Sequence, residues 1–175
     1  MHFVYHAVPE NMHGDKLLPL NKMDSDLEDI KKKALEKYKG REELLERRIE
    51  LLDCLWNDVV QFLPLDPQKV YSLQKELGLI DKIYPYKFYK IPISSFDPEK
   101  TAVYFKTAPG YENYWVEWMK DVDFNNLQTI PKPTIEYYKS LIGTGELPFN
   151  YQFIPHVLYK GTIDISDAEI IELTD

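Results

Sequence analysis

The chain opens with His2-Phe3-Val4-Tyr5-His6-Ala7-Val8-Pro9 and carries, near its other end, Phe153-Ile154-Pro155-His156-Val157-Leu158-Tyr159-Lys160-Gly161. Both stretches are short and rich in aromatic and β-branched residues, and Pro or Gly closes each of them, which is typical of β-strands. We expect the two strands to pair in one sheet, so that His6 and His156 face one cleft. This pairing is the leading sequence-based hypothesis for a functional site.

Helical patterns lie mainly in the first half of the chain. Ser25 and Glu28 have the spacing of a capping box, and Asp66-Pro67 combines a capping acid with a proline in the first helical turn. The segment from Leu51 to Leu63 is the most apolar of the chain, and its length allows a buried helix. We therefore predict helices over residues 25–40, 41–49, 51–63, 66–78 and 133–142.

Strand-like patterns dominate after residue 83. We predict strands over residues 84–93, 101–107, 153–159 and 163–173, and an irregular aromatic loop over 108–133. This order indicates an α+β fold, in which helices clustered in the N-terminal half pack on a mixed or antiparallel sheet that pairs the N- and C-terminal strands. At 175 residues, the chain is predicted to form a single domain, residues 1–175.

Composition limits the classes of partner and compartment. The formal net charge is -8 at pH 7, whereas a general nucleic-acid binder or a protein of anionic membrane surfaces normally carries a basic field. Cys54 is the only cysteine, and neither a signal peptide nor an apolar span of ~20 residues is visible. We expect a cytoplasmic protein, with export by a route that reads no cleavable signal left open.

Both histidines are candidates for chemistry near neutral pH. His6 alternates with Val4 and Val8 along its strand, so these three side chains point to one face and Tyr5 points to the other. His156 follows a proline, and proline within a strand indicates an edge or a bulge that can turn a side chain toward a site. The alternative for each histidine is a purely structural role.

The triplet Trp56-Asn57-Asp58 forms a polar island in the most apolar segment. Buried Asn and Asp side chains need hydrogen-bond partners, so this triplet either fixes a neighbouring loop, orients a histidine or binds a ligand. An aspartate beside His156 would fix its tautomer and raise its basicity. We expect no metal, because the sequence has no Cys pair and no His-Glu-x-x-His motif.

Two stretches resemble the ADP-ribosyltransferase-like fold. The opening Phe3 to Pro9, followed by Gly14 and Leu17-Leu18-Pro19-Leu20, is similar to the histidine-bearing first strand, turn and apolar stretch of many members. The segment Tyr159 to Ile165, followed by Ile170-Ile171, is similar to the closing hairpin of some members. The chain also resembles a bacterial protein family to which we attach no function.

The resemblance implies an ADP-ribosyltransferase that uses NAD. His6 would then contact the NAD ribose, Tyr111 or Tyr114 would cover the base, and His156 with Asp58 would act as acid or base. Such transferases carry a catalytic glutamate on a late strand, but Phe153 to Tyr159 has none, which leaves Glu169 as the candidate. The remaining expected ligand-binding residues are Tyr5, Trp56, Asn57 and Tyr159.

Two other functions remain open at this point. The acidic net charge and the aromatic loop are also typical of a non-catalytic interaction protein, such as an immunity-type partner that masks a basic surface. The third possibility is a metal-independent hydrolase that uses both histidines. The expected partner is therefore a small nucleotide ligand or another protein.

Overall fold

The computed structural model describes residues 1–40, 42–110 and 113–175. In this part of the chain the fold is α+β, and all strand pairs are antiparallel. The α-helices are α1 (Glu28–Glu36), α2 (Pro67–Glu76) and α3 (Lys132–Leu141). The strands are β1 (Phe3–Ala7), β2 (Lys16–Leu17), β3 (Arg48–Ile49), β4 (Cys54–Leu55), β5 (Val60–Phe62), β6 (Lys87–Pro92), β7 (Thr101–Lys106), β8 (Tyr114–Trp118), β9 (His156–Tyr159), β10 (Ile163–Asp164) and β11 (Glu169–Glu172).

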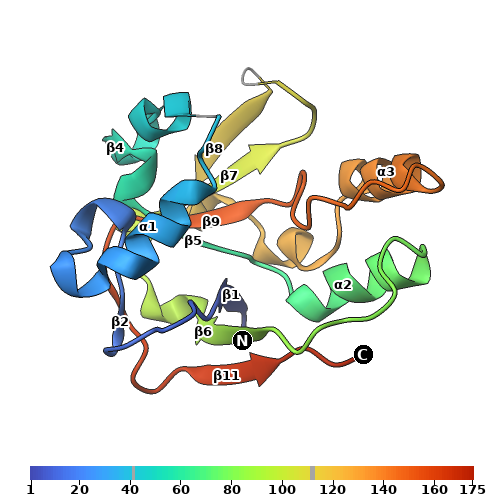
Figure 1. The fold of residues 1–175 in the computed structure, drawn as a ribbon. Coiled ribbons are helices and arrows are strands. Elements are labelled where there is room, and N and C mark those ends of the chain that lie inside the picture. Colours follow the sequence, from blue (N-terminus) through green and yellow to red (C-terminus); the bar gives the residue numbers. More distant parts are fainter. Residues whose placement is uncertain (41, 111–112) are drawn as a thin grey trace.

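A three-stranded sheet joins the two ends of the chain, in the order β1-β6-β11 (Figure 1). Strand β6 is central, with Lys90 opposite Tyr5 on one side and opposite Glu169 on the other. The first and last strands thus share a sheet without pairing directly. Val4 and its partner Ile91 are 0% and 3% exposed on one face of this sheet, and Phe88 is 2% exposed on the other, so both faces are packed.

A four-stranded sheet has the order β5-β9-β7-β8. Its two central strands carry the most deeply buried residues, and Val103 and Val157 are opposite each other and both 0% exposed. Strand β9 therefore lies in a different sheet from β1. The expected direct pairing of the two histidine-bearing strands was wrong, because β1 takes β6 as its partner and β9 is enclosed between β5 and β7.

An isolated β-bridge joins the two sheets, between β1 and the residue after β5. The amide of Tyr5 donates to the carbonyl of Leu63 at 2.8 Å, and the amide of Leu63 donates back to the carbonyl of Tyr5 at 2.8 Å. Apolar clusters extend from this bridge toward the two sides of the sheets. The bridge therefore fixes how the sheets sit against each other.

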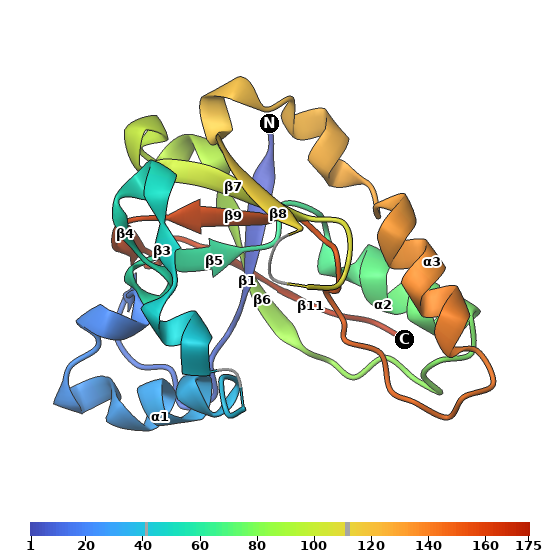
Figure 2. The ribbon, with the colours of Figure 1, turned by 90° about the horizontal axis from the view of Figure 1, so that it is seen from above.

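Helices α2 and α3 lie side by side at one end of the molecule, whereas α1 lies at the opposite end (Figures 1 and 2). Helix α2 begins as its sequence predicts, because Asp66 accepts a hydrogen bond from the amide of Gln68 at 2.9 Å and proline follows the cap. Tyr138 of α3 and Leu65, which lies just before α2, are both 0% exposed and belong to one apolar cluster. Helix α3 belongs to the second half of the chain, so the helices are not confined to the first half.

Three predicted elements were wrong. The segment 51–63 forms short 3-10 turns and the strands β4 and β5 instead of a buried helix, and Asp53 within it has a left-handed backbone (φ 48°) that a helix excludes. The charged segment 41–49 contains the 3-10 turn Glu42–Glu46 and strand β3. The expected loop 108–133 contains β8, whose aromatic and β-branched residues pair with β7.

Candidate functional site

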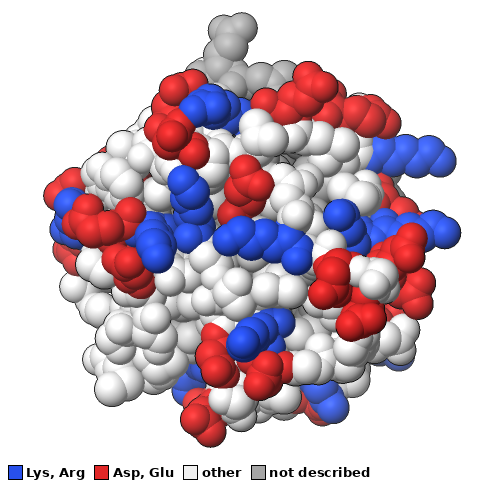
Figure 3. Space-filling model, turned by 90° about the vertical axis from the view of Figure 1, so that its left-hand side faces the viewer, with Lys and Arg blue, Asp and Glu red and all other residues white. Residues whose placement is uncertain are grey.

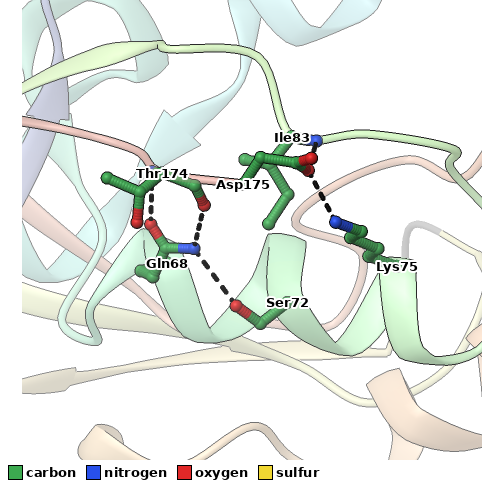
Figure 4. Close-up of polar contacts among 6 residues, drawn as sticks. All are labelled: Gln68, Ser72, Lys75, Ile83, Thr174 and Asp175. Carbon is green, nitrogen blue, oxygen red and sulfur yellow. Dashed lines mark hydrogen bonds and ion pairs between the residues drawn. The ribbon is translucent and has the colours of Figure 1, made fainter.

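A hollow of about 600 Å³ lies where the last residues of the chain meet α2. The side-chain amide of Gln68 accepts from the amide of Thr174 and donates to its carbonyl, at 2.9 Å each. The carboxylate of Asp175 accepts from Lys75 at 2.8 Å and from the amide of Ile83 at 2.6 Å (Figure 4). These groups satisfy one another, so the hollow is better explained as a clamp that fixes the last strand on α2.

A second, smaller pocket has different chemistry. It measures about 290 Å³ and lies on the outer side of the four-stranded sheet, over β7 and β8. We call it the aromatic–arginine pocket. Its lining residues are Arg47, Arg48, Ile49, Glu50, Leu51, Trp56, Tyr104, Tyr114 and Val116.

Three aromatic rings form a row in this pocket, and one guanidinium covers them. Trp56 and Tyr104 meet edge to face at 5.1 Å, and Tyr104 stacks on Tyr114 at 5.5 Å. The guanidinium carbon of Arg47 lies 3.7 Å from the ring centroid of Tyr114, 5.6 Å from that of Tyr104 and 5.5 Å from that of Trp56. Each contact is within the range of cation–π attraction.

Local structure explains why these residues converge. Tyr104 and Val116 are directly opposite in the β7–β8 pair, and Tyr114 lies two residues from Val116 on the same face. Trp56 reaches the row from a 3-10 turn, and its amide donates to the carbonyl of Arg47 at 2.8 Å. The turn is held by Asp58, which accepts from the amide of Leu55 at 2.8 Å.

One cation of the pocket has a nitrogen without a hydrogen-bond partner among the described residues. Nη2 of Arg47 is buried, and no hydrogen bond from it exists within the described residues. The neighbouring Arg48 is paired with Asp53. Burial raises the pKa of Tyr104, with the charge of Arg47 acting in the opposite direction, so the phenol is neutral at pH 7. Within the part of the chain that the structure describes, Nη2 of Arg47 is therefore a charged donor open to a further acceptor.

His156 lies next to the pocket. It is directly opposite Tyr104 in the β7–β9 pair, so both side chains leave the same face of the sheet. Its Nδ1 lies 2.8 Å from the carbonyl oxygen of Ile154, which only accepts, so Nδ1 carries the proton. Burial lowers the pKa of His156 to about 4, despite the opposing effect of this hydrogen bond. The imidazole is therefore neutral at pH 7, with a lone pair on Nε2.

His6 faces the other side of the four-stranded sheet. Its ring centroid lies 5.5 Å from that of Phe62, and Phe62 is directly opposite Val157, the residue after His156 on β9. Since neighbouring strand residues point to opposite faces, His156 points away from His6. The expectation of one shared cleft was therefore wrong. Burial also lowers the pKa of His6 to about 4, and its Nδ1 donates to the carbonyl of Ala7 at 2.8 Å.

Asp58 of the polar island has structural partners, and its neighbour Asn57 is buried. Asn57 is 4% exposed. Asp58 accepts from the side chain of Asn21 at 2.8 Å in addition to Leu55, and the hydrogen bond from Asn21 is the main cause that lowers its pKa. Both carboxylate oxygens of Asp58 are thus engaged, and neither of these bonds involves His156.

The other predicted site residues lie apart from the pocket. Tyr5 is in the bridge between the sheets, and Tyr159 is a core residue whose ring is tilted against that of Phe96, with the centroids 4.9 Å apart. Glu169 is on β11, where it pairs with Lys90 at 2.8 Å. Tyr111 lies outside the described residues.

The structure thus brings together Trp56 and Tyr114, with His156 beside them. Sequence reasoning missed Arg47, Tyr104 and Glu50. Arg47 belongs to a run of charges that is typical of a solvated helix face. No local signal distinguishes it from its neighbours, because its position depends on the register of distant strands.

A comparison with models of known protein families, with curated proteins and with solved structures found no match. The fold and the pocket chemistry are therefore the basis for a functional assignment.

Three further observations concern possible partners. The described residues contain no group of three or more His, Cys, Asp or Glu side chains arranged to hold a metal ion. No described helix has both the length and the apolar character that a membrane crossing needs. On the face drawn in Figure 3, acidic and basic side chains are interspersed.

Proposed function

We propose that this protein binds a nucleotide in the aromatic–arginine pocket, and that NAD is the first ligand to test. The observation that carries the proposal is the guanidinium of Arg47, which covers three aromatic rings while its Nη2 has no partner among the described residues. A guanidinium is a preferred group for binding phosphate, and aromatic rings are preferred surfaces for stacking a base. A nucleotide supplies both the anion and the planar ring.

The reaction that we propose is an ADP-ribosyl transfer from NAD. In its simplest form, the bond between C1′ of the ribose and the nicotinamide nitrogen breaks, nicotinamide leaves with the bonding electrons, and water adds to C1′ with loss of a proton. Glu50 is the carboxylate of the pocket lining, and a carboxylate stabilises the positive charge that develops on the ribose. His156, neutral at pH 7 and next to Tyr104, is the candidate base.

A thermal-shift titration with NAD, ADP-ribose and nicotinamide tests the binding step. A ligand at about 100 times its Kd stabilises the native state by about 2.7 kcal/mol. For a chain of this size, that corresponds to a rise in Tm of roughly 5–10 °C. Tyr114→Leu removes one ring of the row and should reduce the rise in Tm. Trp115→Leu is the matched control, because Trp115 is the next residue on β8, 43% exposed and stacked on Phe105 instead.

The outcome separates binding from chemistry. An equal rise in Tm for Tyr114→Leu and Trp115→Leu would mean that the ligand binds elsewhere. If NAD binds, release of nicotinamide should be measured for the parent protein and for Glu50→Gln. We expect Glu50→Gln to retain binding and to lose at least tenfold in rate. No nicotinamide release by the parent protein would reject the transfer step and leave a nucleotide-binding protein.

An interaction protein is the second candidate, because a specific surface favours it. Leu147 is 81% exposed, Phe149 is 73% exposed and Ile142 is 53% exposed in the segment that follows α3. Large apolar side chains this exposed often mark contact surfaces. In this case Leu147→Ser with Phe149→Ser should abolish binding to a partner without changing any effect of NAD on Tm.

A further inference from the structure

We infer that the aromatic–arginine pocket holds a single nucleotide unit, a base with one phosphate, and that Arg47 selects the phosphorylated form over the free nucleoside. The inference rests on the proposed function and names the ligand class of the same site. NAD and other dinucleotides would then enter the pocket by one half only, with the second half outside it.

The size of the pocket is the first argument. Ligand pockets commonly measure about 300–1,000 Å³, and this one measures about 290 Å³. It is therefore at the lower end of the range. A dinucleotide has two bases, two riboses and two phosphates, and needs about twice the space of one nucleotide. The pocket fits one such unit.

The charge of the pocket is the second argument. Three ionised side chains line it: Arg47, Arg48 and Glu50. Arg48 is already compensated by Asp53, and Glu50 repels anions. One guanidinium is left to neutralise one anionic group. The second phosphate of a dinucleotide finds no further free cation among the described residues of this lining, so the pocket rewards one phosphate only.

The hydrogen bonding of Arg47 is the third argument. Buried donors without a partner cost free energy, and a charged donor costs more than a neutral one. Nη2 of Arg47 has no hydrogen bond to lose among the described residues when the guanidinium turns toward a ligand. Its planar face, which lies 3.7 Å from the ring centroid of Tyr114, also matches the stacking of guanidinium planes on rings and bases. A phosphate oxygen is therefore a favourable acceptor for this group.

Calorimetric titration with matched ligand pairs tests the inference. The pairs are nicotinamide mononucleotide with nicotinamide riboside, and AMP with adenosine, with NAD titrated alongside. We expect each phosphorylated ligand to bind roughly 10- to 100-fold more tightly than its nucleoside, as is typical of hydrogen bonds to a charged group. NAD should bind within about threefold of the better mononucleotide, because its second half adds no pocket contact.

Two variants of Arg47 and one control variant test whether this residue causes the preference for nucleotides over nucleosides. Arg47→Met removes the charge at similar length and should make nucleotide and nucleoside bind alike. Arg47→Lys keeps the charge without the planar fork, so it should retain part of the preference even if Arg47→Met folds poorly. Lys87→Met is the control for net charge, because Lys87 lies on β6 in the other sheet, 3.6 Å from Glu172.

The titrations distinguish failure of the single-nucleotide inference from failure of the proposed nucleotide-binding function. Equal binding of nucleotides and nucleosides by the parent protein would overturn the inference while leaving a nucleotide site in place. Binding of NAD that is more than tenfold tighter than that of either mononucleotide, and unchanged in both Arg47 variants, would also overturn it. Absence of binding by all five ligands would overturn the proposed function together with the inference.

Discussion

Acid should unfold this protein through two specific imidazoles, and the effect can be calculated from the structure. The pKa values of His6 and His156 fall from 6.5 in the unfolded chain to about 4 in the folded protein, mainly through burial. Between these two values the unfolded chain binds protons that the folded protein does not. The stabilising contribution is therefore complete above pH 6.5 and is lost as the pH falls toward 4.

The magnitude follows from the two pKa values. Lowering the pH from about 7 to about 5 costs at most about 1.8 kcal/mol for each histidine. Both side chains are only half-buried, so solvent screens part of the effect and we expect about 1 kcal/mol each. With a urea dependence of about 2 kcal/mol/M, each histidine should account for about 0.5 M of the decrease in the unfolding midpoint.

Urea unfolding at both pH values, for the parent, His6→Gln and His156→Gln, provides the assay. Glutamine does not titrate, so each variant should show a smaller pH dependence than the parent, whatever its stability at pH 7. The carboxylates titrate alike in all three proteins and cancel from the comparison. The same decrease in midpoint for all three proteins would refute the reasoning, because neither histidine would then have a lower pKa in the folded protein than in the unfolded chain.

Three further substitutions test the packing. Gly161→Ala would place a Cβ 2.6 Å from the Tyr159 ring, so the free energy of unfolding, measured by thermal melting, should fall by about 1–3 kcal/mol. The decrease should be smaller when Tyr159→Leu is also present. Leu65→Ala removes a side chain that is 0% exposed and should cost about 2–5 kcal/mol, measured by urea unfolding; a cost below about 1 kcal/mol would contradict its burial. Gln68→Ala removes the acceptor of the Thr174 amide, so that amide should exchange hydrogen faster, whereas an unchanged rate would argue against the clamp.

Local signals predicted part of this fold well. The cap and proline at Asp66-Pro67 located the start of α2, and the β-branched run at Thr101 located β7, because both features act within a few residues. The segment 51–63 was misassigned because an apolar run of that length suits either a buried helix or strands. Its pairing with β9, more than ninety residues away in sequence (Val60 opposite Tyr159), decided the outcome.

The candidate site was predictable only in part, for a similar reason. Trp56 and Tyr114 stand out as aromatic residues in unusual surroundings, and both line the pocket. Arg47 carries no such mark, because a charge in a charged run is usually solvated. Arg47 differs from its charged neighbours because it lies against the rings of Tyr104 and Tyr114, which the β7–β8 pairing places on one face. The prediction that His6 and His156 share a cleft was wrong because the sequence shows only which side chains alternate along each strand. It does not show which strands pair, and the pairing decides which faces meet.

The three-stranded sheet also sets the order in which this protein can acquire its structure on the ribosome. Strand β1 emerges first, but its ladder partner β6 ends at Pro92, and the outer strand β11 begins only at Glu169. Until β6 is made, β1 has no ladder partner, and until β11 is made, β6 keeps one unpaired edge. Sheets closed by such distant segments form slowly and expose edges meanwhile. We therefore expect nascent chains that stop before residue 87 to need a chaperone, and the native fold to form in one late step.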